Sequence, residues 1–146
     1  MRKSLISAAA LITIATSASA QTYNADAVKA ACSDEWGAEF DMVKYCMDQR
    51  AEGFDTYIAL KSAAPDMFAI SFANCETEWG TEWEMVAYCA KSERDSAAQI
   101  SSATQGLPDD IANIITSNCT REWANEFTMI AYCSKQQAAA WRSINQ

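Results

Sequence analysis

One cysteine-containing motif occurs three times in the sequence and constrains the fold more than any other feature. All copies fit the pattern C-x-x-E-W-[GA]-x-E-[FW]-x-M-[VI]-x-Y-C. They begin at Cys32, Cys75 and Cys119, and each ends 14 residues later, at Cys46, Cys89 and Cys133. The copies are 43 and 44 residues apart, and a period of this size is typical of stacked supersecondary units. We therefore expect a tandem array of three similar units.

Each unit has the sequence signals of a helical hairpin. The first helices are expected before the motif tryptophans, over residues 24–36, 65–79 and 108–123. Pro65 and Pro108 precede aspartates, which is favourable at the start of a helix. Gly37 and Gly80 suit the residue that ends a helix, whereas Ala124 at the third corner suits it less well. A second helix of roughly 22 to 25 residues is expected after each corner.

N-capping signals precede the second helices. Thr81 and Asn125 are expected to be N-caps, and Thr81 with Glu84 matches a capping box. Ala38 is the equivalent, weaker cap in the first unit. The corners are therefore expected to be two or three residues long.

The second helix of the first unit has an apolar face that covers more than half of its circumference. Its main stripe contains Phe40, Val43, Met47, Phe54 and Ile58, and an adjacent arc contains Met42, Tyr45 and Cys46. So wide a face needs two neighbouring helices, namely the partner within the hairpin and a helix of the next repeat. The predicted fold is all-α, with six helices in three αα-hairpin repeats that form a short solenoid or a compact bundle.

The two cysteines of each motif are predicted to form a disulfide across the hairpin. The first lies about one turn before the corner and the second about two turns after it, which is close enough for a bridge. Repeat symmetry selects Cys32–Cys46, Cys75–Cys89 and Cys119–Cys133. Each bridge would stabilise the fold by roughly 3 kcal/mol in the chain-entropy model. Metal binding is disfavoured because the chain has no histidine and no C-x2-C pair, and no cofactor is expected.

The first 20 residues have the pattern of a secretory signal peptide. Arg2 and Lys3 precede an apolar run, and Ala18-Ser19-Ala20 resembles a cleavage site. The run is too short to span a bilayer of about 30 Å, and no membrane span is expected later. Export to the periplasm or the medium would supply the oxidising conditions that disulfides require. The mature chain would form one compact domain, 21–146, with hairpin repeats at 21–63, 64–106 and 107–146.

The charge of the chain limits the classes of partner. The net charge is −8, and removal of the two positive charges of Arg2 and Lys3 leaves −10. Such a surface repels phosphate backbones, so nucleic acid is a disfavoured partner, and a basic protein or a cation would be attracted. A simpler explanation is that a high net charge keeps an exported protein soluble.

A glutamate and a tryptophan recur together in every motif. The pairs are Glu35–Trp36, Glu78–Trp79 and Glu122–Trp123. The tryptophans are expected to pack beneath the corners, with a ligand-binding aromatic row as the alternative. The glutamates lie in the last helical turn, where a carboxylate opposes the macrodipole. We expect them to accept hydrogen bonds from the N–H groups that open the second helix or from the motif tyrosine; solvent exposure and a functional ring of carboxylates are the alternatives.

The pattern C-x3-W-x9-C, with Met and Tyr before the second cysteine and Gln49 or Gln136 soon after it, resembles a motif of small exported bacterial proteins of no assigned function. Three copies cover nearly the whole mature chain. The second copy departs from the motif because Ser92 replaces the glutamine. The resemblance implies a helical-hairpin protein outside the cytoplasm and no particular activity.

The sequence favours a non-enzymatic function. It has no histidine and only four glycines, and it contains no nucleophile elbow, phosphate-binding loop or calcium loop. No catalytic residue is predicted. The favoured interpretation is a helical-repeat scaffold that binds an unknown macromolecule through its continuous surface. The alternatives are an acidic envelope or stress accessory protein that binds cations or basic polypeptides and, least favoured, a hydrolase with a carboxylate pair.

Overall fold

The computed structural model describes residues 22–145, which form six α-helices and one 3-10 helix. The elements are α1 (Ala25–Trp36), α2 (Phe40–Ala63), η1 (Asp66–Phe68), α3 (Ala69–Trp79), α4 (Trp83–Ala103), α5 (Asp109–Trp123) and α6 (Phe127–Ile144). This part of the chain contains no strand. The all-α prediction, with six helices, is therefore confirmed. The predicted signal peptide, residues 1–20, lies outside the described residues.

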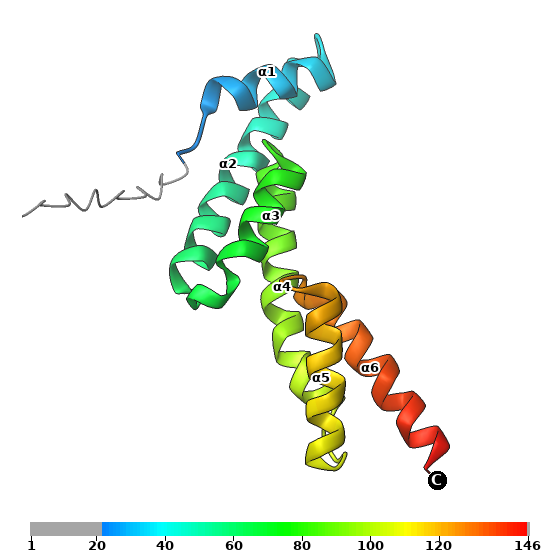
Figure 1. Ribbon diagram of the computed structural model, residues 1–146. Helices are drawn as coiled ribbons and strands as arrows, with labels where there is room; N and C mark the ends of the chain where they lie inside the picture. The colour runs from blue at the N-terminus through cyan, green and yellow to red at the C-terminus, as the bar shows by residue number, and fades with distance from the viewer. Residues whose placement is uncertain (1–21, 146) are drawn as a thin grey trace, which may run out of the picture.

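The helices pair into three hairpins that follow one another along the molecule. α1 packs on α2, α3 on α4, and α5 on α6. The second helices hold the hairpins together, because α4 packs against both α2 and α6. Figure 1 shows the resulting elongated array, with the α1–α2 corner and the C-terminal end of α6 at opposite ends of the molecule. Each hairpin thus packs against its neighbour, as the repeats of a solenoid do.

The corner between the helices has the same backbone conformation in all three hairpins. Gly37, Gly80 and Ala124 end the first helices with φ values of 57°, 55° and 48°. The amide two residues further on donates to the carbonyl of the preceding tryptophan, at 3.1, 3.0 and 3.0 Å. With ψ values of −117°, −108° and −102° at these positions, the corner is a type II′ turn, which favours glycine. The predicted role of the two glycines in ending a helix is confirmed.

The second helices begin one residue later than the sequence signals indicate. Their N-cap residues are Glu39, Glu82 and Glu126. The predictions that Thr81 and Asn125 are N-caps, and that Thr81 and Glu84 form a capping box, are wrong. The reason is that the turn extends from the tryptophan to the N-cap glutamate and places these two residues at its third position. α4 and α6, with 21 and 18 residues, are also shorter than expected.

A disulfide bridges each hairpin, and the predicted pairing is confirmed. The bridges are Cys32–Cys46, Cys75–Cys89 and Cys119–Cys133. Their Cα atoms lie 5.8, 5.8 and 5.7 Å apart, within the usual range for a disulfide. The first cysteine of each pair is buried, so the bridges belong to the apolar core. Three such bonds are typical of a chain that folds in an oxidising compartment.

The larger of two apolar cores lies between the first and second hairpins. Its centre is aromatic: the ring centroid of Trp83 lies 4.8 Å from that of Phe54 and 5.8 Å from that of Tyr57. The smaller core lies within the third hairpin and includes Ile115 and Ile130. The first two hairpins are therefore joined by large aromatic contacts that the third hairpin does not repeat in the same form.

Part of the predicted apolar face of α2 is exposed. Val43 is buried and Phe54 packs against the larger core, as expected. Phe40, Tyr45 and Ile58, however, are exposed. For Phe40 the expectation of burial is wrong because no hairpin precedes the first corner within the described residues.

Candidate binding groove

The motif tryptophans occupy equivalent places in the three hairpins. Each is half-buried. Trp36 and Trp79 pack against the larger core, and Trp123 packs against the smaller one. These residues lie at the corners, so their burial stabilises the end of each first helix.

The motif glutamates do not cap the second helices, and the capping hypothesis is wrong. Oε2 of Glu35 instead accepts a 3.3 Å hydrogen bond from Nη2 of Arg50, whose side chain is buried. Glu78 and Glu122 are exposed and lie on the rims of two surface cavities. The three carboxylates therefore have different surroundings despite their identical place in the motif.

A different glutamate, Glu93 of α4, binds the first N–H groups of α6. Its Oε2 accepts a 2.7 Å hydrogen bond from the Phe127 amide, and its Oε1 accepts hydrogen bonds from the amide and the hydroxyl of Thr128, at 3.4 and 2.6 Å. This contact joins the second and third hairpins. Glu93 is the fourth residue after Cys89, as Arg50 is the fourth after Cys46. Arg50 binds Glu35 within its own hairpin, so this shared position does not indicate a contact between hairpins.

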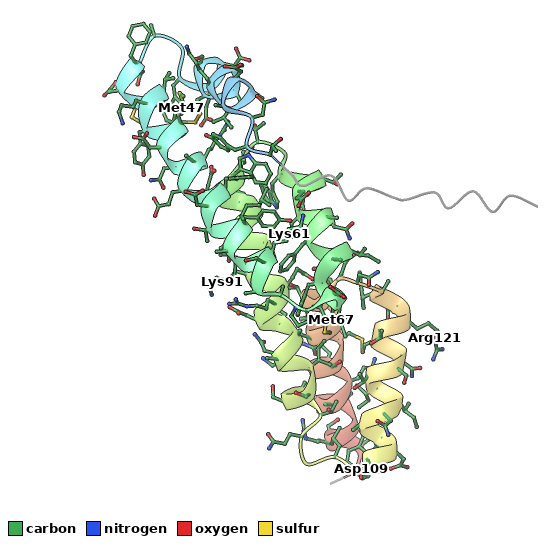
Figure 2. All side chains as sticks on the ribbon, turned by 90° about the vertical axis from the view of Figure 1, so that its left-hand side faces the viewer. Met47, Lys61, Met67, Lys91, Asp109 and Arg121 are labelled. Atoms are coloured by element: carbon green, nitrogen blue, oxygen red, sulfur yellow. A yellow bond between two sulfur atoms is a disulfide. The ribbon has the colours of Figure 1, made fainter. Side chains whose placement is uncertain are left out.

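A groove of about 660 Å³ lies between α4 and α5. It is lined by Met67, Ala97, Ile100, Ser101, Thr104, Ala112, Asn113, Thr116, Thr120, Ala124, Asn125, Phe127 and Ile130. None of these residues is charged, although the whole chain has a net charge of −8. Figure 2 shows Met67 at the junction between the second and third hairpins. The groove is therefore an uncharged surface beside a junction between repeats.

The groove exists because small side chains replace large aromatic ones. In the repeat register, the groove residues Ala97, Ile100, Ala112 and Thr116 correspond to Phe54, Tyr57, Phe68 and Phe72 of the preceding junction. There the aromatic side chains fill the space between α2 and α3, with ring centroids 6.1 Å apart for Tyr57 and Phe72, and 5.6 Å apart for Phe68 and Phe72. The same backbone arrangement thus encloses a packed core at one junction and an open groove at the next.

Polar contacts also close the first junction and are absent from the equivalent positions of the groove. The hydroxyl of Tyr57 donates to Oε1 of Glu76, which also accepts a 2.7 Å hydrogen bond from Nζ of Lys61. Burial, with the hydrogen bond to Glu76, raises the pKa of the Tyr57 hydroxyl, so this hydroxyl stays protonated at neutral pH. In the groove, Thr120 and Thr104 replace Glu76 and Lys61.

No protein family, curated protein or solved structure matches this chain. The function of the groove is therefore inferred from its own shape, charge and side chains. Among residues 22–145, no helix is both long enough and apolar enough to cross a membrane.

Proposed function

We propose that this chain is an exported, non-enzymatic helical-repeat module that binds an apolar segment of a partner macromolecule in the groove between α4 and α5. The observation that supports this most directly is the loss of aromatic side chains at one of two equivalent junctions. Protein interiors are close-packed, and an unfilled space between helices lowers stability. An occupant that supplies large apolar side chains would restore the packing that Phe54 and Phe68 provide at the first junction.

The uncharged lining favours an apolar partner over a charge-driven one. A site for basic polypeptides or cations would present carboxylates, and the groove presents methyl groups, hydroxyls and amides. The acidity of the rest of the surface supports the second candidate, which is binding of a basic polypeptide outside the groove. The two candidates differ in salt dependence, because exposed charge pairs are screened at high ionic strength.

Export is supported by three observations. The chain has the N-terminal pattern of a signal peptide, three disulfides bridge its hairpins, and its motif resembles that of small exported bacterial proteins. A non-enzymatic role is supported by the lack of histidine and of recognisable catalytic motifs in the sequence.

The groove can be tested by filling it with the side chains of the first junction. The substitutions Ala97→Phe and Ala112→Phe together introduce the residues that stand at these positions in the preceding repeat. Binding of the neutral apolar dye N-phenyl-1-naphthylamine to the oxidised protein is measured by fluorescence titration. We expect the filled variant to bind at least about tenfold more weakly, because each buried aromatic ring displaces dye from an apolar contact.

Matched aromatic substitutions on the exposed sides of the same helices provide the control. Ala98→Phe on α4 and Ser117→Phe on α5 add equal apolar surface at exposed positions outside the groove. This control should keep the dye affinity of the unmodified protein, and about 0.5 M NaCl should leave that affinity nearly unchanged. Equal dye binding by the filled and unmodified proteins, or loss of binding in salt, would contradict the proposal.

A further inference from the structure

Both junctions between neighbouring hairpins are formed by equivalent segments of the chain. The first two residues of one second helix pack against the second helix of the preceding hairpin. At the first junction these residues are Trp83 and Glu84 of α4, and at the second they are Phe127 and Thr128 of α6. The inserted aromatic side chains are well buried, with exposed fractions of 6% for Trp83 and 8% for Phe127.

The receiving helix has a small residue at each junction. Gly53 of α2 lies so close to α4 that a Cβ atom there would be 2.5 Å from the carbonyl carbon of Trp83. Ser96 of α4 takes the same place at the second junction, where its Oγ lies 3.4 Å from Oγ1 of Thr128. The small residue and the inserted aromatic residue therefore form a repeated pair of complementary parts.

The first hairpin has the inserting residues, but no second helix precedes it among residues 22–145 to receive them. Phe40 and Asp41 occupy the positions of Trp83 and Glu84 and begin α2 in the same way. The side chain of Phe40 is 78% exposed. A large aromatic side chain that is buried at two junctions is thus left in solvent at the free end of the stack.

The third hairpin has the receiving surface. Ala140 occupies the position of Gly53 and Ser96, and Ile144 occupies that of Tyr57. Ile144 is 80% exposed, whereas Tyr57 is fully buried. An apolar surface that is covered in the first hairpin is therefore uncovered in the third.

A cavity of about 350 Å³ opens on this surface between α5 and α6. Its lining includes Ile114, Gln137, Ala140, Trp141 and Ile144. Four of its α6 residues occupy the positions of α4 residues that lie beside Phe127 and Thr128. Gln137, Ala140, Trp141 and Ile144 correspond to Glu93, Ser96, Ala97 and Ile100. The cavity is therefore in the place where the corner of a following hairpin would pack.

We propose that Phe40 of one copy of the chain inserts into the cavity between α5 and α6 of a second copy, so that chains associate head to tail. The two surfaces lie at opposite ends of the molecule (Figure 1), so a chain cannot fill its own cavity. Such an interface joins two different surfaces and leaves a free copy of each at the ends of the assembly, which can continue to grow. The association extends the existing stack by a junction of the kind it already contains.

The polar groups of the two ends fit this arrangement. Gln137 stands where Glu93 binds the N–H groups of Phe127 and Thr128. Its amide oxygen can accept a hydrogen bond from the Phe40 N–H, and its amide nitrogen can donate to the carboxylate of Asp41. A glutamate at position 137 would repel Asp41, whereas glutamine does not.

The balance of charge favours this pair of ends over an association of two first hairpins. The third hairpin, residues 107–146, has four acidic and three basic residues, whereas the first, residues 21–63, has eight acidic and four basic ones. Repulsion between a first and a third hairpin is therefore weaker than repulsion between two first hairpins. Added salt should strengthen the association by screening the repulsion that remains.

Sedimentation velocity of the mature, oxidised protein tests the proposal. Over about 1 µM to 1 mM protein, a range in which modest affinities become visible, we expect the mean mass to rise above that of one chain. Phe40→Asp and Ala140→Arg should each weaken this association about 30-fold or more, as the loss of a central contact does. An equimolar mixture of the two variants should form dimers and nothing larger, because each retains one intact end.

An exposed tyrosine of α6 supplies the control. Tyr132→Asp changes an exposed aromatic residue that does not line the cavity between α5 and α6, and this variant should associate as the unmodified chain does. Circular dichroism checks that each variant is folded. A mass of one chain at every concentration, association that Phe40→Asp does not weaken, or a mixture that does not dimerise would overturn the proposal. None of the residues changed in these variants lines the groove between α4 and α5. Head-to-tail association and binding in the groove are therefore tested independently.

Discussion

At the scale of single residues, Ala124 holds a conformation that suits glycine. It has φ 48° and ψ −102° at the corner of the third hairpin, where the first two hairpins have Gly37 and Gly80. Side chains with a Cβ are strained in this region, at a cost on the order of 1 to 3 kcal/mol. The surrounding turn nevertheless forms, because the amide of Glu126 donates to the carbonyl of Trp123 at 3.0 Å as in the other corners.

Ala124→Gly should therefore stabilise the protein. Relief of strain exceeds the gain of unfolded-state entropy that glycine brings, so we expect the free energy of unfolding to rise by about 1 kcal/mol. Urea unfolding of the oxidised protein measures it. The reciprocal change, Gly37→Ala, should lower stability by a similar amount. If Ala124→Gly destabilises the chain, the positive φ at this corner is not a source of strain.

The sequence predicts the structure correctly where the repeated motif and its spacing determine which residues lie close together. The disulfides follow from a constant spacing within each motif, and the glycines follow from their place after the tryptophan. The predicted burial of the Phe40 side chain is wrong because an apolar stripe shows which residues can be buried but does not show whether another helix covers them. Glu93 was missed because its hydrogen bonds join two hairpins and depend on how they dock, which no local pattern expresses.

At the scale of helices, the contact between α2 and α4 depends on Gly53. The ideal Cβ position at this residue lies 2.6 Å from Cα of Glu84, as well as against its amide nitrogen. These are backbone atoms, which cannot move aside as a flexible side chain can. The absence of a side chain therefore sets how closely the first two hairpins approach.

Gly53→Ala should lower stability even though alanine is the better helix former. Helix propensity alone favours alanine by about 1 kcal/mol, whereas overpacking between helices costs about 1 to 3 kcal/mol. We expect a net loss and a weaker contact between α2 and α4, measured by urea unfolding and by faster amide exchange at Tyr57. Ala59→Gly, at an exposed site of α2, reports the propensity term alone. A stabilised Gly53→Ala variant would show that the helices can separate at no cost.

The apolar pattern of a single helix does not predict the groove, although the sequence contains a signal for it. An apolar-face pattern describes one helix at a time, and Ala97, Ala112 and Thr116 are ordinary residues by that measure. Only comparison in the repeat register reveals that four aromatic side chains of the first junction are replaced at the second, those of Phe54, Tyr57, Phe68 and Phe72. A deviation between copies of a repeat is thus more informative about the groove than the motif that the copies share.

At the scale of the whole molecule, each hairpin is stabilised by its contacts with the adjacent hairpins. α1 packs mainly on α2, at one end of the molecule. α3 instead carries Phe72, whose ring lies 6.1 Å from that of Tyr57 in the core between the first two hairpins. In a linear array, loss of a terminal contact stays local, whereas loss of a central one uncouples the units on either side.

Removal of two different disulfides should therefore have different consequences. Both bridges close loops of the same length, with a sequence separation of 14, so each contributes about 3 kcal/mol through the unfolded chain. In Cys32→Ala/Cys46→Ala, amide exchange should accelerate chiefly in α1 and leave α4 and α6 protected. In Cys75→Ala/Cys89→Ala, a loosened α3 withdraws Phe72 from the shared core, and exchange should accelerate in α1, α2 and α3 together. Hydrogen-exchange mass spectrometry separates the two patterns when each variant is measured at the urea concentration that gives it the same overall free energy of unfolding. A uniform loss of protection along the chain in both variants would mean that the stack unfolds as one cooperative unit and that position within it has no effect.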